Sequence, residues 1–238
     1  MPEIRVVVVG PKFEGNVGAI ARCMANFNVE ELYLVNPCEI GETALHRAKH
    51  GDYILQNAVT VDNFEDAVKD CFLVVGTSGV VTKGEKNYTR IPVSVREFAE
   101  CCRGYREKIA IVFGREDIGL LETELNRCDV LVTIPAGDQY PVMNLSHSVA
   151  VVLYEMFQQE KMPVRAEPAD SAEKERMFLF FRELLDQIDY TEARKEATCI
   201  MFRRMMGRSI PTKQEFNTIM GVFGDAAKII KNGGKKWA

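Results

Sequence analysis

Four short segments combine polar side chains with glycines, and these are the places where the chain could do chemistry. The first, NVGAIAR, places Asn16 six residues before Arg22. Asn16 is a good N-cap for a helix over Val17–Phe27, and Gly18 shares a helix face with Arg22. Gly18 lets another backbone or a ligand approach closely, and the donors of Arg22 suit a phosphate or a carboxylate. Taken alone, the segment fits an N-cap, a packing glycine and a surface arginine better than a binding site.

The second and third segments each follow an apolar run that is typical of a buried strand. GTSG ends the run Phe72–Gly76, and such small residues and hydroxyls can receive an adenosine or a ribose, although this signal is weak alone. FGREDIGL follows the second run, and its glycines at 114 and 119 permit a positive φ or a close approach. Glu116 could accept a hydrogen bond from a ribose hydroxyl or a substrate amine, and Arg115 could pair with Glu116. A tight turn whose charges face water is the competing interpretation.

The fourth segment is a turn-rich stretch that opens a long apolar helix. Asn144 precedes LSHSVAVV and is predicted to be its N-cap, at the positive end of the helix dipole. Ser146 and Ser148 lie in the first turn. Ligands bind open α/β sheets at the carboxyl ends of the strands. The third and fourth segments together therefore predict a site for one small molecule, held largely by main-chain groups.

Several common sites are absent from the sequence. Neither a GxGxxG fingerprint nor a GxxxxGK[ST] loop occurs, which argues against a conventional dinucleotide or nucleoside triphosphate site. Ser146 beside His147 does not form a nucleophile elbow. His46 and His50 have a metal-ligand spacing, but no third ligand accompanies them, so we predict no metal site.

Composition narrows the class of protein. The net charge is −4, so any nucleic-acid contact must come from a local patch. The seven cysteines include no CxxC pair and lie mostly in apolar runs, which favours reduced thiols in a cytoplasmic protein. No signal peptide or membrane span is visible, so we expect no membrane partner.

Strands alternate with helices up to about residue 160, which predicts a doubly wound α/β domain with a mostly parallel sheet. The predicted strands are Arg5–Val9, Glu31–Val35, Phe72–Gly76, Ile109–Phe113 and Val130–Ile134. Further helices are predicted over Gly41–His50, Asn63–Asp70 and Val93–Arg103. A polar link at 161–169 separates a domain over residues 1–162 from a helical extension over 163–238. The helices predicted in the extension are Ser171–Tyr190, Thr191–Met206 and Thr212–Ile230. We expect the extension to dock on the first domain or on a second subunit, because three helices alone are marginally stable.

The extension is basic at its end. From Met201 onward there are eight lysines or arginines, including Arg203 and Arg204, against two acidic residues. A solvated helix end with a basic tail and a nucleic-acid contact are both open interpretations.

The four segments, taken together and in order, resemble the signature motifs of one family. NxGxxxR, the GTS strand end, FGREDIGL and IP…MNLSHSVAV resemble those of the SpoU branch of the SPOUT RNA methyltransferases, over Arg5–Glu160. The three-helix extension resembles the TrmJ group of tRNA ribose methyltransferases, and the compact chain suggests an archaeal-type member.

The resemblance implies properties that the spacing of residues alone cannot predict. It implies an α/β domain with a deep trefoil knot near its C-terminal end, against the usual absence of knots. It implies a homodimer that transfers a methyl group from S-adenosylmethionine to a ribose 2′-hydroxyl of tRNA, at nucleotide 32 in the anticodon loop. The residues expected to hold the cofactor are Thr77, Ser78, Gly79, Gly114, Glu116, Ile134, Val142, Met143 and Asn144.

The catalytic arginine of the family maps onto Arg22. An arginine is a poor base because its pKa exceeds about 12. We therefore expect Arg22 to grip a phosphate and stabilise the developing oxyanion, while a phosphate oxygen or water takes the proton. Asn16 would position the Arg22 segment, and Ser146 would lie beside the reacting ribose. The basic residues expected to contact RNA are Arg22, Arg90, Arg115, Arg203 and Arg204, with Arg90 the nearest arginine after the GTS turn.

Two alternatives within the same fold stay open. The target could be rRNA or another tRNA ribose, or the chain could be a catalytically idle RNA-binding dimer. The joint presence of Asn16, Arg22, Glu116 and Asn144 argues against idleness. A nicotinamide-dependent oxidoreductase fits the α/β pattern but lacks the glycine-rich fingerprint.

Overall fold

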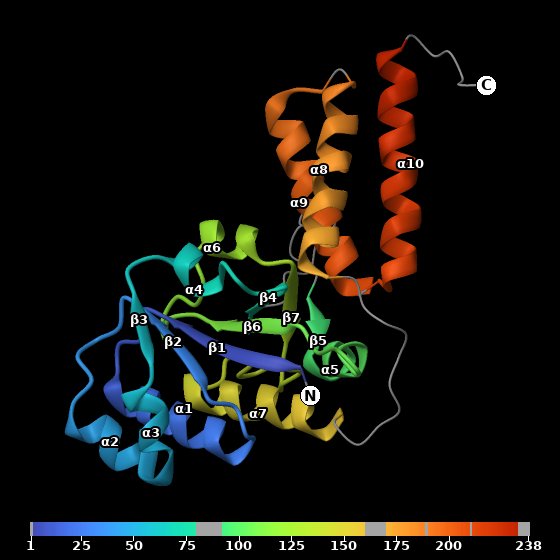
Figure 1. The fold of residues 1–238 in the computed structure, drawn as a ribbon. Coiled ribbons are helices and arrows are strands. Elements are labelled where there is room, and N and C mark those ends of the chain that lie inside the picture. The colour runs from blue at the N-terminus through green and yellow to red at the C-terminus, as the bar shows by residue number, and fades with distance from the viewer. Residues whose placement is uncertain (1, 80–91, 160–169, 189, 210, 233–238) are drawn as a thin grey trace. The chain divides into compact units, whose positions relative to one another are not determined.

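The computed structural model describes residues 2–79, 92–159, 170–188, 190–209 and 211–232 (Figure 1). Within this part of the chain, seven parallel strands form one sheet in the order β3-β2-β1-β6-β4-β7-β5. The strands are β1 (Glu3–Val9), β2 (Glu31–Val35), β3 (Val59–Val61), β4 (Leu73–Thr77), β5 (Val93–Ser94), β6 (Lys108–Phe113) and β7 (Val130–Thr133). The predicted α/β class and mostly parallel sheet are confirmed.

The five predicted strands carry mostly apolar runs, because most of their side chains are buried in the sheet. The two edge strands were missed. β3 has three residues and β5 has two, too few for an apolar pattern to appear. The predicted helix at Val93 begins two residues later, because Ser94 forms a capping box with Glu97.

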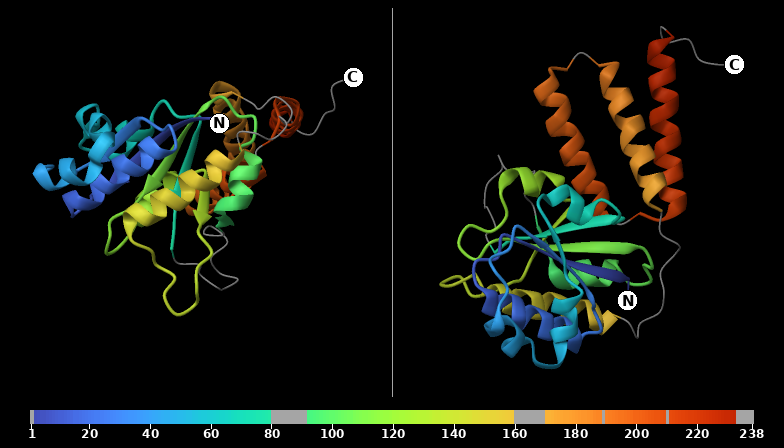
Figure 2. Two further views of the ribbon diagram at one scale, coloured as in Figure 1. Left: turned by 90° about the horizontal axis from the view of Figure 1, so that it is seen from below. Right: turned by 60° about the vertical axis from the view of Figure 1, so that its left-hand side comes forward.

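Helices cover both faces of the sheet. Helices α1 (Glu14–Asn26), α2 (Glu42–Ala48), α3 (Asp52–Gln56), α5 (Val95–Cys101) and α7 (Leu145–Gln158) lie on one face, whereas α4 (Phe64–Val68) and α6 (Glu122–Arg127) lie on the other (Figures 1 and 2). The second face packs Phe64, Val68 and Leu125 against Val7 and Val112 of the two central strands. A rigid sheet therefore fixes the loops that leave its carboxyl edge.

Two local predictions are wrong. The first helix begins at Glu14, with Phe13 in the N-cap position, so Asn16 lies inside the first turn and is not the cap. Its side chain has tertiary partners instead. The predicted helix over Gly41–His50 ends at Ala48, because Lys49 has a φ of 51° and begins the short 3₁₀ turn η1 (Lys49–Gly51). The two histidines of that region therefore do not share one helix.

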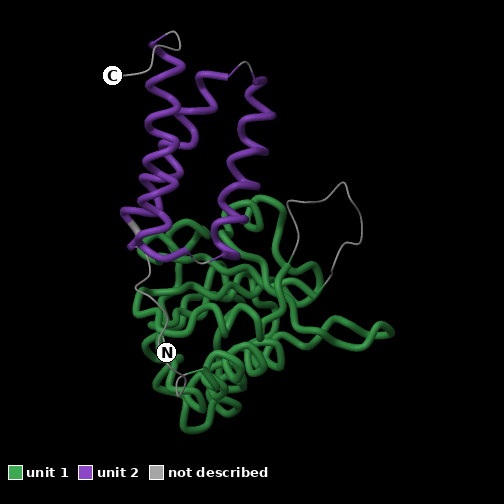
Figure 3. The backbone as a smooth tube through the Cα atoms, turned by 90° about the vertical axis from the view of Figure 1, so that its right-hand side faces the viewer, with its two compact units in different colours: residues 1–165 green, residues 166–238 purple. Residues whose placement is uncertain are grey.

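The chain divides into two compact units, residues 1–165 and 166–238 (Figure 3). The second unit contains three helices, α8 (Ser171–Asp186), α9 (Glu192–Ser209) and α10 (Lys213–Lys231). Its buried core is formed by Met177, Phe202, Met206 and Phe216. The rings of Phe181 and Phe202 stack with their centroids 4.1 Å apart.

Candidate functional site

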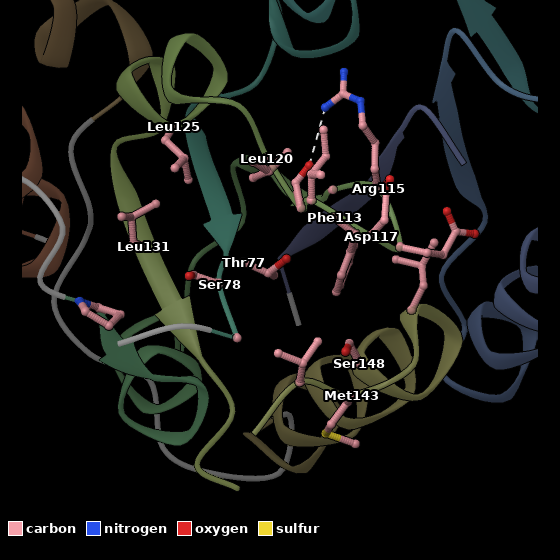
Figure 4. Close-up of a pocket in the computed structure, with 18 residues that line it drawn as sticks. Thr77, Ser78, Phe113, Arg115, Asp117, Leu120, Leu125, Leu131, Met143 and Ser148 are labelled. Atoms are coloured by element: carbon pink, nitrogen blue, oxygen red, sulfur yellow. Dashed lines mark hydrogen bonds between the residues drawn. The ribbon is translucent and has the colours of Figure 1, made fainter. Parts of the chain in front are cut away.

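A pocket of about 420 Å³ lies at the carboxyl ends of β4 and β6, next to the segment that leads into α7 (Figure 4). Its walls come from the GTS turn, the FGREDIGL loop and the start of α7. Apolar side chains of Leu120, Leu125, Leu131 and Met143 line it beside hydroxyls of Thr77 and Ser148. Small-molecule sites combine an apolar lining with a few polar groups in this way.

The FGREDIGL loop folds back on itself through its two glycines. Arg115 and Gly119 exchange two backbone hydrogen bonds, with N···O distances of 3.1 and 3.0 Å. Gly119 has a φ of 67°, which favours glycine. A Cβ on Gly114 would lie 2.2 Å from the carbonyl carbon of Gly119, so only glycine fits there. The close approach expected from sequence is therefore made by the loop's own backbone.

Arg115 pairs with Glu124 of α6 instead of Glu116. Its two terminal nitrogens donate to the two Glu124 carboxylate oxygens at 3.0 Å each, and Glu124 is 8% exposed. Glu116 accepts instead from Asn16 and from the backbone amides of Lys12 and Phe13, so the two neighbouring side chains have separate partners. The Arg115 guanidinium thus closes the loop against α6.

The GTS turn is held by hydrogen bonds to the neighbouring strands. The Thr77 hydroxyl donates to the carbonyl of Val112 at 2.9 Å, and the Ser78 amide donates to Val132 at 2.9 Å. Gly79 faces Val142, 3.5 Å from the position of a Cβ. The turn is therefore anchored to both neighbouring strands.

A directed row of hydrogen bonds joins three of the four segments. The Ser146 hydroxyl donates to Asn144 Oδ1 at 2.8 Å, and Asn144 Nδ2 donates to Asn16 Oδ1 at 3.2 Å. Asn16 Nδ2 then donates to Glu116 Oε1 at 2.9 Å. Glu116 also accepts from the backbone amides of Lys12 and Phe13, at 2.9 and 3.4 Å. Asn144 is the N-cap of α7, as predicted, because its side chain accepts from the Ser146 amide.

Arg22 stands apart from this row. Gly18 packs against the backbone of α2, with Ala44 O 2.1 Å from the position of a Cβ, so the close approach predicted at Gly18 is made by another backbone. Arg22 is exposed and lines none of the three pockets described here. Its neighbour Cys23 contacts the carbonyl of Ser146 at 3.9 Å, and burial raises the pKa of that thiol.

The SpoU rRNA Methylase family matches residues 3–154. The chain belongs to this family. It is 38% identical to the tRNA (cytidine-2'-O-)-methyltransferase TrmJ of Methanocaldococcus jannaschii, over 92% of this chain and 98% of that protein. The TrmJ of Sulfolobus acidocaldarius is 32% identical, over 92% of this chain and 91% of that protein. The crystal structure of TrmJ from Z. mobilis ZM4 matches with a TM-score of 0.67 and 26% identity, over 94% of this chain and 97% of that chain.

Most residues expected to hold the cofactor of this SpoU-family chain line the 420 Å³ pocket. Two do not. Ile134 lines a smaller adjoining pocket of about 50 Å³ together with Thr77 and Met143. Asn144 lines a third pocket, of about 480 Å³, together with its hydrogen-bond partner Asn16.

The arginines expected to contact RNA differ in their surroundings. Arg90 lies outside the described residues. Arg203 donates to both carboxylate oxygens of Glu175 at 3.1 Å and lies 4.1 Å over the ring of Phe178. Arg204 is 2% exposed, so its guanidinium lies inside the helical unit, and its RNA contact stays a prediction.

The sequence interpretation missed three residues beside the site: Lys12, Phe13 and Arg47 line the third pocket. Lys12 also pairs with Asp117 at 2.5 Å, and this hydrogen bond holds the pKa of the Asp117 carboxyl below its usual range. Arg47 lies 32 residues from Gly15 in the sequence, yet its guanidinium covers Gly15. No local pattern could have indicated that contact.

Among the described residues, no helix is both long and apolar enough to cross a membrane. The same part of the chain holds no group of three or more histidine, cysteine or acidic side chains arranged to bind a metal ion.

Proposed function

We propose that this protein transfers a methyl group from S-adenosylmethionine to a ribose 2′-hydroxyl of tRNA. The observation that carries the proposal is the 38% identity to a tRNA (cytidine-2'-O-)-methyltransferase over 92% of the chain, which extends past the family domain. Membership of a methylase family and the pocket at the sheet edge support the same activity.

The pocket fits a nucleoside-containing methyl donor. Its volume of about 420 Å³ lies within the range of small-molecule sites. Leucines at 120, 125 and 131 would pack against an adenine ring, while main-chain groups of Thr77, Gly79 and Gly114 would bond the ribose and the amino-acid part. When bound, the donor supplies an electrophilic methyl group. The chain's own residues then have to orient the acceptor and help remove a proton from it.

In this proposal, Arg22 contacts the RNA and stabilises the developing oxyanion, and a phosphate oxygen or a water accepts the proton. Asn16 positions the segment that carries Arg22 through its hydrogen bond to Glu116. Ser146, which is bonded to Asn144, lies near the acceptor ribose. Support comes from the hydrogen-bonded row and from the exposed position of Arg22. A guanidinium suits charge stabilisation and not proton abstraction.

We also propose a homodimer. Arg22 lies six residues after Asn16 in α1, about 9 Å along the helix axis. A second copy packed on α1 and α7 could bring Arg22 to the partner's pocket. An aromatic cluster at the end of α1 and on α7 supports this choice of interface. The ring centroid of Phe27 lies 6.3 Å from that of Tyr154 and 5.9 Å from that of Phe157, and Tyr154 is 49% exposed.

Three finer proposals accompany this function. The α/β domain contains a trefoil knot at the loops that lead into α7, supported by the family match and by the crossing from β6 to β7 past β4. The target is nucleotide 32 of the anticodon loop. The protein is cytoplasmic, supported by seven free cysteines, of which Cys71, Cys102 and Cys128 are buried.

Methyl transfer from labelled S-adenosylmethionine to total tRNA and to rRNA tests the activity, followed by mapping of the modified nucleotide. We expect incorporation into tRNA as a 2′-O-methyl ribose. Incorporation into neither RNA would overturn the proposal, and incorporation into rRNA alone would replace its substrate. Arg22→Ala should still bind the cofactor but lose turnover. Full turnover in that variant would exclude the role given to Arg22.

A further inference from the structure

The third pocket, of about 480 Å³, opens beside the start of α1. Lys12 and Phe13 come from the loop after β1, and Arg47 comes from α2. The side chains of Asn16 and Asn144 line the same pocket. None of these residues lines the 420 Å³ pocket.

One wall separates the two pockets. It consists of the bonded side chains of Asn16, Asn144 and Glu116, with contacts of 2.9 and 3.2 Å. Glu116 lines the first pocket, whereas the two asparagines line the third. Lys12 of the third pocket also pairs with Asp117 of the first. A molecule in the third pocket therefore lies next to whatever the first pocket binds.

The charge of the third pocket favours an anion. Arg47 is exposed, and its Cζ lies 3.1 Å from the position of a Cβ on the buried Gly15. No hydrogen bond or ion pair of Arg47 is found within the described part of the chain. Lys12 also lines the pocket, and its ammonium pairs with Asp117 at 2.5 Å, so Arg47 is the cation that favours an anion there. The pocket's carboxylate, Glu14, accepts from the amides of Gly41 and Ala44 at 2.8 and 3.3 Å, so its charge is directed at the start of α2.

An aromatic ring completes the pocket. Phe13 is 62% exposed although it is a large apolar residue. Exposed aromatic rings beside cationic side chains are the arrangement that binds single-stranded nucleic acid, because bases stack on the ring while the cations contact phosphates.

We propose that the third pocket binds one nucleotide of the RNA substrate, with its phosphate on Arg47 and its base against Phe13. The nucleotide in the third pocket lies beside the acceptor ribose. The wall of Asn16, Asn144 and Glu116 separates this nucleotide from the methyl donor in the 420 Å³ pocket. Arg47 and Phe13 thereby become specificity-determining residues. The inference rests on the proposed RNA substrate.

Binding of an unmodified tRNA transcript, measured over a series of salt concentrations, tests the proposal on the full chain. Each lost phosphate contact should reduce the slope of log affinity against log salt by about 1. We therefore expect Arg47→Ala to weaken binding and to lower the slope by that amount, and Arg47→Lys to retain the slope. Phe13→Ala should weaken binding about tenfold with an unchanged slope, because stacking releases no counterions.

Arg106→Ala is the matched control, since Arg106 is also exposed but precedes β6 at the opposite end of the sheet. Thermal melting checks that each variant is folded. An Arg47→Ala variant that melts like the wild type and keeps both affinity and slope would overturn the proposal. Methyl transfer by the wild type is measured separately. If Arg47→Ala lowers the salt slope of tRNA binding but the wild type transfers no methyl group, the proposed activity is wrong and the proposed nucleotide pocket is retained.

Discussion

Gly114 and Gly18 each lie against another stretch of backbone, and neither position has room for a side chain. For Gly114 the neighbour is Gly119 of the same loop, and for Gly18 it is Ala44 of the adjacent helix. The backbone of a loop or helix can move only together with its neighbours. A single added methyl group would therefore act on a whole segment of structure.

Gly114→Ala should open the loop that lines the 420 Å³ pocket. Because the added Cβ would meet Leu120 N at 2.3 Å, the loop must shift, at a cost of about 1–3 kcal/mol as for other overpacked sites. We expect at least a tenfold loss of S-adenosylmethionine affinity by calorimetry. Gly137→Ala is the control, since nothing lies within 4 Å of its added Cβ. Equal affinities in the two variants would contradict this prediction.

At the residue scale, the sequence predicted a local capping role better than it predicted partners from distant segments. The capping role of Asn144 depends only on the residues that follow it, and it was found. Asn16 was predicted to be a helix cap and Arg115 to pair with Glu116. Their side chains instead contact Glu116 and Glu124, which lie 100 and 9 residues away. Short-range rules cannot supply contacts that the sheet creates.

At the scale of elements, the Arg115–Glu124 pair ties the FGREDIGL loop to α6. The side chains of Arg115 and Glu124 are 21% and 10% exposed, so both charges are largely removed from water. Glu124 also accepts from the amide of Leu121 at 2.7 Å, which fixes the start of α6. One carboxylate thus orders two neighbouring elements.

Glu124→Gln should destabilise the protein by about 3 kcal/mol, because it leaves a partly buried guanidinium without its counter-charge. The free energy of unfolding in urea measures this loss. Arg115→Met together with Glu124→Gln should recover part of it in a double-mutant cycle. Glu122→Gln, in an exposed position of the same helix, is the control. Additive losses in the cycle would show that the two side chains are not coupled.

Among the elements, length decided what the sequence could predict. β1 carries an apolar run of four residues and β6 a run of five, and both strands were found, whereas β3 and β5 add only edge pairings of three and two residues. The break at Lys49 depends on its positive φ, for which lysine gives no signal.

At the scale of the whole molecule, a charged network joins the amino ends of three strands. Arg5 is 1% exposed and contacts Asp70 at 2.5 Å and Glu31 at 2.7 Å. Lys108 of β6 also contacts Glu31 at 3.1 Å. The hydrogen bonds from Arg5 hold the pKa of the Asp70 carboxyl below its usual range.

This network predicts a pH dependence of stability. The pKa of Asp70 is lower in the folded chain than in the unfolded one, where it is about 3.9. Its contribution is therefore fully present above that value and is lost as the pH falls through the folded pKa. Asp70→Asn should make unfolding free energy less dependent on pH in the acid range, whereas Asp62→Asn should not. Identical pH profiles for wild type and Asp70→Asn would contradict this prediction.

The polar link over residues 161–169 predicted a domain boundary, and the chain forms compact units over residues 1–165 and 166–238. All described residues that line the three pockets belong to the unit of residues 1–165. A fragment Met1–Arg165 should therefore bind S-adenosylmethionine as the full chain does. It lacks the basic residues that follow Met201, so its tRNA affinity should fall at least tenfold and its salt dependence should become shallower.

Calorimetry with the cofactor and binding of a tRNA transcript separate the possible roles of the helices. Lost cofactor binding in the fragment would mean that the first unit needs the helices for its own stability. Unchanged tRNA affinity would mean that the helices do not contact RNA, and that Arg47, Lys12 and Arg22 of the first unit supply the cationic surface. The predicted pattern, with cofactor binding kept and tRNA affinity reduced, assigns the methyl donor to the sheet edge and part of the RNA to the helices.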